Sequence, residues 1–118
     1  MAGKIDARLA ELSIQLPAAA TPVGNYVAYV VTGNLVFVSG QLPLVDGALA
    51  YKGKVGENVT IEDAQAAARA CALNLVAQAK AACGGDLDRI ARVVKLGGFV
   101  ASSADFTQQA AIINGASD

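Results

Sequence analysis

The segment 24–43, GNYVAYVVTGNLVFVSGQLP, constrains the fold of this chain more than any other stretch. β-Branched and aromatic residues, which favour strands, fill two runs within it, YVAYVVT and LVFVS. Gly33 and Asn34 stand between these runs, and both residue types tolerate the positive φ that a two-residue hairpin turn requires. The sequence therefore predicts a β-hairpin in this segment.

A polar loop follows the second predicted strand directly, with the sequence Ser39-Gly40-Gln41-Leu42-Pro43. It combines a hydroxyl, a glycine that lets a ligand approach the backbone, an amide and a proline of fixed φ. The end of the hairpin is therefore the first candidate for a functional site.

The composition is that of one folded domain covering residues 1–118, because 54% of the residues are hydrophobic and 16% are charged. No apolar run reaches the roughly 18 residues that span a bilayer. The first twelve residues alternate charged with apolar side chains, unlike a signal peptide. We therefore expect a cytoplasmic protein with no membrane partner. A net charge of -1 and nine scattered basic residues also argue against nucleic acid as a partner.

The chain has no histidine, which removes the commonest general base, the Ser-His and Cys-His nucleophile pairs and most catalytic zinc sites. Its two cysteines, Cys71 and Cys83, fall on one predicted helix, where twelve positions correspond to roughly 18 Å. That separation excludes a disulfide between them. We interpret both as small buried apolar side chains, the alternative being a reactive thiol.

Residues 60–83 carry the clearest helix pattern, with Thr60 as its cap, Asp63 three residues later and Gly84-Gly85 as its end. One side of this helix is apolar and is expected to face a core. Much of the remaining circumference is alanine, which would let a second backbone approach closely. We expect a subunit contact there, using Ala66, Ala70, Ala77 and Ala81.

The other elements are weaker. A short amphipathic helix is expected over 3–13, and Asp46-Gly47 is expected to form a turn between short strands or within an irregular loop. A long strand is expected over 89–101, a last helix from Ser103, and the first turn of a further helix at Ser117-Asp118. This order predicts an α+β domain in which helices pack on one face of a sheet.

A set of motifs runs in order along the chain: Gly24-Asn25-Tyr26, Ser39 to Pro43, Asn74 with Ala82-Cys83-Gly84, Arg92 to Lys95 with Phe99, Val100 and Phe106, and Asn114 to Asp118. Together these motifs resemble the RidA/YjgF family, also described under the endoribonuclease L-PSP name. The resemblance covers nearly the whole chain from Pro17 onward. Its final motif resembles the branch of the family that carries NGASD.

The resemblance implies a chorismate-mutase-like α+β fold, assembled as a homotrimer with ligand sites in the clefts between subunits. For the best understood branch, it also implies hydrolytic deamination of reactive enamines and imines, without metal or organic cofactor. The expected partner is therefore a small-molecule substrate or carboxylate ligand.

By position, the resemblance implies catalytic roles for three residues: Tyr26 as a phenol at the cleft, Ser39 as a hydroxyl for substrate or water, and Asn114 as a pocket-lining amide. Each has a structural alternative. Tyr26 would cap the sheet edge, Ser39 would satisfy a strand-end backbone group, and Asn114 would be a turn residue or helix cap. The implied substrate-binding residues are Gly40, Gln41, Pro43 and Gly115. Lys95 is interpreted as a solvated strand residue rather than a catalytic amine.

One departure from the family pattern bears on function. In the deaminase branch an arginine that grips the substrate carboxylate follows the last helix, and this sequence ends before that segment. We therefore expect a domain without the final helix and the C-terminal strands. A non-catalytic trimer that binds small metabolites such as 2-oxo acids, or regulates through them, is the alternative function. Ribonuclease activity is a third, supported by the family name alone and disfavoured by charge and the absence of histidine.

Overall fold

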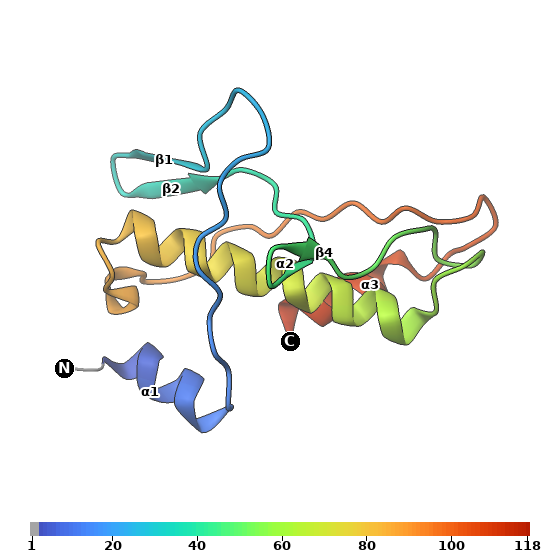
Figure 1. Ribbon diagram of the computed structural model, residues 1–118. Helices are drawn as coiled ribbons and strands as arrows, with labels where there is room; N and C mark the ends of the chain where they lie inside the picture. The colour runs from blue at the N-terminus through green and yellow to red at the C-terminus, as the bar shows by residue number, and fades with distance from the viewer. Residues whose placement is uncertain (1–2) are drawn as a thin grey trace.

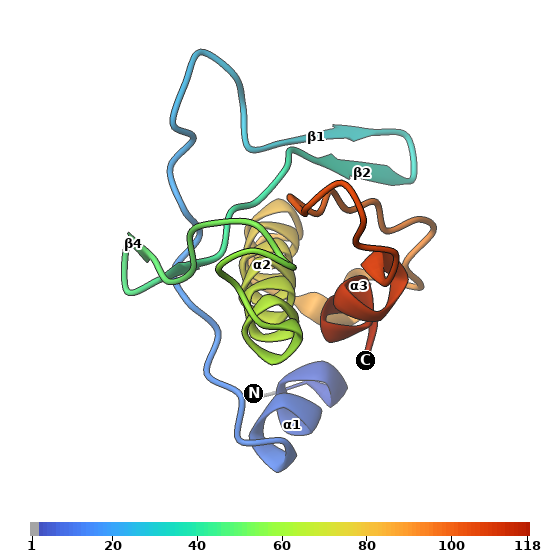
Figure 2. The ribbon, with the colours of Figure 1, turned by 90° about the vertical axis from the view of Figure 1, so that its right-hand side faces the viewer.

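The long helix α2 is the centre of the fold (Figure 1). The computed structural model describes residues 3–118. The β1–β2 hairpin lies on one side of α2 and α3 packs along another, while α1 lies apart beneath them (Figure 2). The elements are α1 (Lys4–Glu11), β1 (Tyr29–Thr32), β2 (Leu35–Val38), β3 (Leu44–Val45), β4 (Ala48–Leu49), α2 (Ile61–Ala82), the 3-10 helix η1 (Leu87–Arg89) and α3 (Gln109–Ser117).

The predicted hairpin is confirmed. β1 pairs antiparallel with β2 in a register that sets Tyr29 opposite Val38 and Thr32 opposite Leu35. Gly33 takes the positive φ of the turn, 55°. The second predicted turn is also present, because Asp46 and Gly47 both have positive φ, 52° and 81°, between the short paired strands β3 and β4.

The predicted helix is confirmed as α2, with bounds within a residue of those expected. The Thr60 hydroxyl accepts a hydrogen bond from the Asp63 backbone N–H at 3.1 Å, which caps the helix start. Two of the alanines assigned to a subunit contact, Ala70 and Ala77, are instead buried within this chain. The chain's own hairpin and α3 both pack against α2, so a small side chain is needed within the subunit.

A small apolar cluster joins α2 to α3 and to the loop before α2. Its buried members are Val55, Ala64 and Ile112. Gly115 lies against the backbone of Gln65 so closely that a Cβ at this position would collide with the Gln65 carbonyl oxygen. The Gln65 side chain adds a hydrogen bond from Nε2 to the Ala111 carbonyl, 3.0 Å. Close backbone contact and one hydrogen bond from the Gln65 side-chain amide therefore fix α3 on α2.

The last helix starts later than predicted. Ser103 lies in a turn, because its carbonyl accepts from the Phe106 N–H and its own N–H donates to the Val55 carbonyl. The helix begins only at Gln109. The expectation of a new helix at Ser117-Asp118 is also wrong, since Ser117 is the last residue of α3. Serine and aspartate begin turns as readily as helices, and both incorrect predictions of a helix start rested on these residue types.

The long strand expected over 89–101 does not form within the described residues. The segment carries no ladder, and its one tie near the end is the bond from Val55 N–H to the Ala101 carbonyl, 3.0 Å. Val93 and Val94 are 74% and 73% exposed, so neither face of the segment is covered. A strand needs a neighbour for its backbone groups, and the hairpin pairs only with itself. The predicted mixed α/β class is confirmed, but two separate two-stranded sheets replace the single expected sheet.

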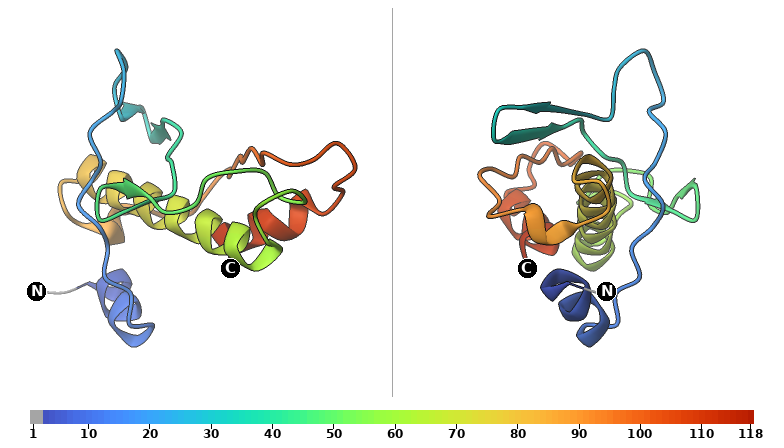
Figure 3. Two further views of the ribbon diagram at one scale, coloured as in Figure 1. Left: turned by 45° about the vertical axis from the view of Figure 1, so that its right-hand side comes forward. Right: turned by 90° about the vertical axis from the view of Figure 1, so that its left-hand side faces the viewer.

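The N-terminal helix α1 is held by a residue from far along the chain. The Asp88 carboxylate accepts hydrogen bonds from the backbone N–H groups of Lys4 and Ile5, at 2.8 and 2.9 Å. Gly3 allows this approach, because a Cβ there would collide with the Asp88 side chain. From α1 the chain runs past α2 to the hairpin as an extended linker (Figure 3). Within residues 3–118, no helix is long and apolar enough to cross a membrane.

Acid is expected to release α1. The N–H groups of Ile5 and Lys4 lower the pKa of the Asp88 carboxyl below its ordinary value, and the Lys4 charge acts in the same direction. A lowered folded pKa means that this carboxylate stabilises docking above its unfolded pKa of about 3.9 and that the effect disappears as pH falls through the folded pKa. Asp88→Asn is expected to loosen α1 already at neutral pH.

Amide NMR spectra of Lys4 and Ile5 across a pH titration would measure this release. Asp105→Asn is the control, since Asp105 lies in an exposed turn far along the chain. Unchanged Lys4 and Ile5 signals in Asp88→Asn would contradict a holding role for Asp88.

Candidate functional site

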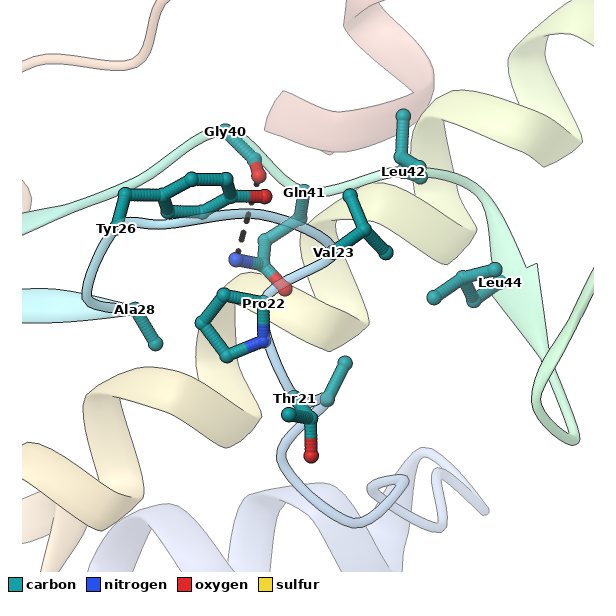
Figure 4. Close-up of a pocket in the computed structure, with 10 residues that line it drawn as sticks. Thr21, Pro22, Val23, Tyr26, Ala28, Gly40, Gln41, Leu42 and Leu44 are labelled. Atoms are coloured by element: carbon teal, nitrogen blue, oxygen red, sulfur yellow. Dashed lines mark hydrogen bonds between the residues drawn. The ribbon is translucent and has the colours of Figure 1, made fainter.

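Two segments that flank the hairpin face one another and enclose a small pocket. Residues 20–28 lead into β1, and residues 40–44 follow β2, so the hairpin brings the two segments together. The cavity between them is about 20 Å³, which is room for about one water molecule. Figure 4 shows Pro22, Tyr26 and Gln41 around this opening. The predicted polar loop is therefore one wall of a pocket.

Tyr26 lines the pocket from the segment before β1. Its backbone N–H donates to the Gly24 carbonyl at 3.0 Å, which turns the chain just ahead of the hairpin. The side chain is 49% exposed, so the phenol remains accessible. The structure thus places Tyr26 in the pocket lining, in the segment before β1 rather than within a strand.

Ser39 and Gln41 brace the loop itself. The Ser39 hydroxyl donates to the Val27 carbonyl at 2.7 Å, which ties the end of β2 to the approach of β1. Gln41 folds back, and its Nε2 donates to the carbonyls of Ser39 at 3.0 Å and Gly40 at 3.4 Å. In this state the Ser39 hydroxyl satisfies a backbone group, as one of its two predicted interpretations requires. Gly40 and Gln41 line the pocket.

Asn74 anchors the far end of the loop and was not predicted as a site residue. Its Nδ2 donates to the carbonyls of Leu42 and Leu44 at 3.1 and 3.0 Å. Pro43 lies between these two residues, and its own carbonyl accepts from the Ala50 N–H at 3.1 Å. The Asn74 side chain is almost fully buried. The side-chain amide of Asn74 therefore ties the loop to α2 by two hydrogen bonds.

Gln78 anchors the other wall in the same way. Its Nε2 donates to the Ala20 carbonyl at 2.8 Å. Asn74 and Gln78 stand one helical turn apart on an alanine-rich helix, and this spacing is the signal that sequence reasoning overlooked. A pair of amides on a face that is otherwise apolar indicates two buried backbone groups that need donors.

Asn114 and Gly115 lie elsewhere. Both belong to α3, and neither lines the pocket. Asn114 is exposed, and its carbonyl accepts from the Asp118 N–H at 2.9 Å, while Gly115 packs on Gln65 of α2. Lys95 is exposed in the unpaired segment after η1. The structure thus brings Tyr26, Gly40 and Gln41 together in the pocket lining. Ser39 and Pro43 belong to the same loop but do not line the pocket, and Asn114 and Gly115 lie apart.

The pocket is neutral. Its lining is aliphatic apart from the Tyr26 phenol, the Gln41 amide, the Thr21 hydroxyl and backbone groups. Among residues 3–118, no group of three or more Cys, Asp or Glu side chains is placed to hold a metal ion. Cys71 and Cys83 are both free, and burial raises the pKa of the Cys71 thiol. That shift favours the interpretation of Cys71 as an apolar side chain rather than a reactive thiolate.

Such an arrangement can bind and orient a small molecule. A phenol and an amide can donate hydrogen bonds to a polar ligand group, and a water-sized cavity beside them can hold a water next to it. Chemistry that relies on an already electrophilic substrate suits this set, because no strong base or nucleophile lines the pocket.

Comparison with known protein families gives one match over almost the whole chain. The sequence model of the family described as "YjgF/chorismate mutase-like, putative endoribonuclease" matches residues 6–118. A curated protein from Trypanosoma cruzi, Protein TCP17, is 53% identical over 116 residues, which are 98% of this chain and 72% of that protein.

Two solved structures share both sequence and fold. A protein of unknown function from Agrobacterium tumefaciens is 50% identical with a TM-score of 0.84, over 94% of this chain and 66% of that one. A "putative endoribonuclease" from Shewanella oneidensis MR-1 is 35% identical with a TM-score of 0.91, over 95% of this chain and 74% of that one. The chain thus spans about two thirds to three quarters of the length of these relatives.

Proposed function

Because this chain belongs to the YjgF/chorismate mutase-like family, we propose that it hydrolytically deaminates reactive enamines and imines derived from amino acids. The observation that carries the proposal is the juxtaposition of the Tyr26 phenol and the Gln41 amide at a cavity of about 20 Å³. The cavity has the size of the one reactant, water, that such a hydrolysis must place.

This reaction needs neither a strong base nor a nucleophilic side chain, because the imine carbon is already electrophilic. An enamine becomes an imine when its β-carbon takes up a proton and its nitrogen loses one, and water then adds to the electrophilic carbon of the C=N bond. The resulting carbinolamine breaks its C–N bond, releases ammonia and leaves a carbonyl. Tyr26 would donate a hydrogen bond to the nitrogen, while Gly40 and Gln41 would orient the water and the substrate. Ser39 would exchange its bond to the Val27 carbonyl for one to substrate or water.

We further propose that the active form is a homotrimer whose clefts complete the site. Support comes from the exposed apolar side chains of the hairpin, which include Val30, Val31 and Phe37. An apolar patch of this kind is typical of a subunit contact. In such an assembly Asn114 and Gly115 of a neighbouring copy would approach the pocket, and Pro43 would shape its rim.

A rate assay on sized fractions tests both parts of this proposal. The full chain would be separated by size exclusion, and each fraction would be given 2-iminopropanoate while ammonia and 2-oxo acid are measured. We expect hydrolysis well above buffer in the trimeric fraction, because only that form has complete clefts. A trimer that does not accelerate hydrolysis would contradict the catalytic proposal. Activity confined to the monomeric fraction would contradict the proposal that clefts between subunits complete the site.

Binding without turnover is the second candidate, favoured by the absence of any charged side chain from the pocket lining. Amide and phenol donors beside the cavity could bind a 2-oxo acid at the pocket opening yet leave it unchanged. Calorimetry with 2-oxo acids separates the two functions. Heat of binding together with an unaccelerated imine assay would support a binding or regulatory protein.

A further inference from the structure

The two buried amides of α2 hold opposite walls of the pocket. Asn74 donates to the carbonyls of Leu42 and Leu44, and Gln78 donates to the carbonyl of Ala20, at 2.8 Å. Both side chains are only 2% exposed. Buried amides are retained where they satisfy other buried polar groups, and here all three acceptors belong to segments that line the pocket.

The linker wall has little else to hold it. Within residues 3–118, the bond from Gln78 is the only hydrogen bond made by the segment 15–23. The loop wall is similar, because the bonds of the Gln41 side chain are local and stay within the loop. Its tie to α2 is Asn74. Among the described residues, these amides therefore make all the hydrogen bonds between α2 and the two walls.

One helical turn separates the two anchors. Positions four apart on an α-helix are about 6 Å apart along its axis, and that spacing is rigid because every residue between them is helical. We propose that Asn74 and Gln78 are positioning residues that set the width of the pocket and hence its affinity for its ligand. The effect on ligand affinity rests on the proposed function, because it requires that this pocket bind the substrate.

A purely structural role for these amides is the alternative, and the chain supplies a matched control. Gln65 lies on the same helix and makes the same kind of bond, from Nε2 to the Ala111 carbonyl at 3.0 Å. Its acceptor belongs to α3, which does not line the pocket. Gln78→Met and Gln65→Met each remove one amide donor with little change in shape, but only the first touches a pocket wall.

Amide NMR spectra of the unliganded full chain test the proposal without any substrate. In Gln78→Met we expect shifts and faster hydrogen exchange over residues 20–28, and in Gln65→Met changes confined to the contact between α2 and α3. Ala20 is only half-buried, so water can replace the lost donor and the variant should fold. Undisturbed residues 20–28 in Gln78→Met, or equal disturbance of them in Gln65→Met, would overturn the proposal.

Two further measurements secure the test. Coupling across the hydrogen bond from the Asn74 side-chain amide to the Leu42 and Leu44 carbonyls is expected in the unmodified protein, and its absence would overturn the role of Asn74. With 2-iminopropanoate, Gln78→Met is expected to raise KM about tenfold with little change in kcat. An unchanged KM in Gln78→Met counts against the proposal. An inactive unmodified protein contradicts only the proposed function, because the spectra still decide the positioning role.

Discussion

Replacing Gly115 by alanine is expected to destabilise the fold by about 2 kcal/mol. Helix propensity alone predicts the opposite sign, since alanine is about 1 kcal/mol better than glycine inside a helix. Position 115 differs because a Cβ there would collide with the Gln65 carbonyl oxygen, which is backbone and cannot rotate away. Relief requires α3 to move off α2, and that movement opens the cluster around Ile112.

Chemical denaturation measures the effect, provided that both proteins unfold in one cooperative step. Gly97→Ala is the control, because a Cβ at Gly97 meets no atom within 4 Å and the residue has no positive φ. We expect Gly97→Ala to leave stability nearly unchanged. A Gly115→Ala protein as stable as the unmodified chain would show that α2 and α3 are not in close contact.

Replacing Tyr26 by phenylalanine is expected to lower kcat/KM for imine hydrolysis about 100-fold under the proposed function. The change removes the hydroxyl alone and keeps the ring that lines the pocket. A donor that acts on charge developing in the transition state affects kcat, whereas one that only binds the ground state affects KM. We therefore expect the loss to appear mainly in kcat.

Tyr29→Phe is the matched control for this measurement. Tyr29 begins β1 three residues later and does not line the pocket. It is expected to retain the full rate. Equal losses in the two variants would assign the effect to the hairpin rather than to the Tyr26 hydroxyl, and no loss in Tyr26→Phe would remove this residue from the mechanism.

Local patterns sufficed for those parts of the fold that depend on near neighbours. The hairpin turn at Gly33, the turn at Asp46 and the cap at Thr60 each depend on residues at most a few positions apart, and all three are present. The structure also places the polar loop at Ser39 near Tyr26, because a hairpin brings its two ends together.

The other parts of the fold and of the site depend on contacts between residues that are far apart in the sequence. The segment 89–101 has the composition of a strand, but pairing requires a neighbouring backbone, which composition does not encode. Asn74 and Gln78 find their acceptors 30 or more positions away, and Asp88 finds Lys4 after 84. No periodicity within α2 or η1 identifies these acceptors. The pocket anchors were therefore visible in the sequence only as polar residues on an apolar face.

The contact between Asp88 and α1 also bears on the order in which the chain folds. It closes a loop of 84 residues, and the entropy cost of closing a loop rises with its length. Its acceptor, the Asp88 carboxylate, lies in η1, a few residues after the end of α2. We therefore expect α1 to dock late in folding, onto α2 and η1 that have already formed.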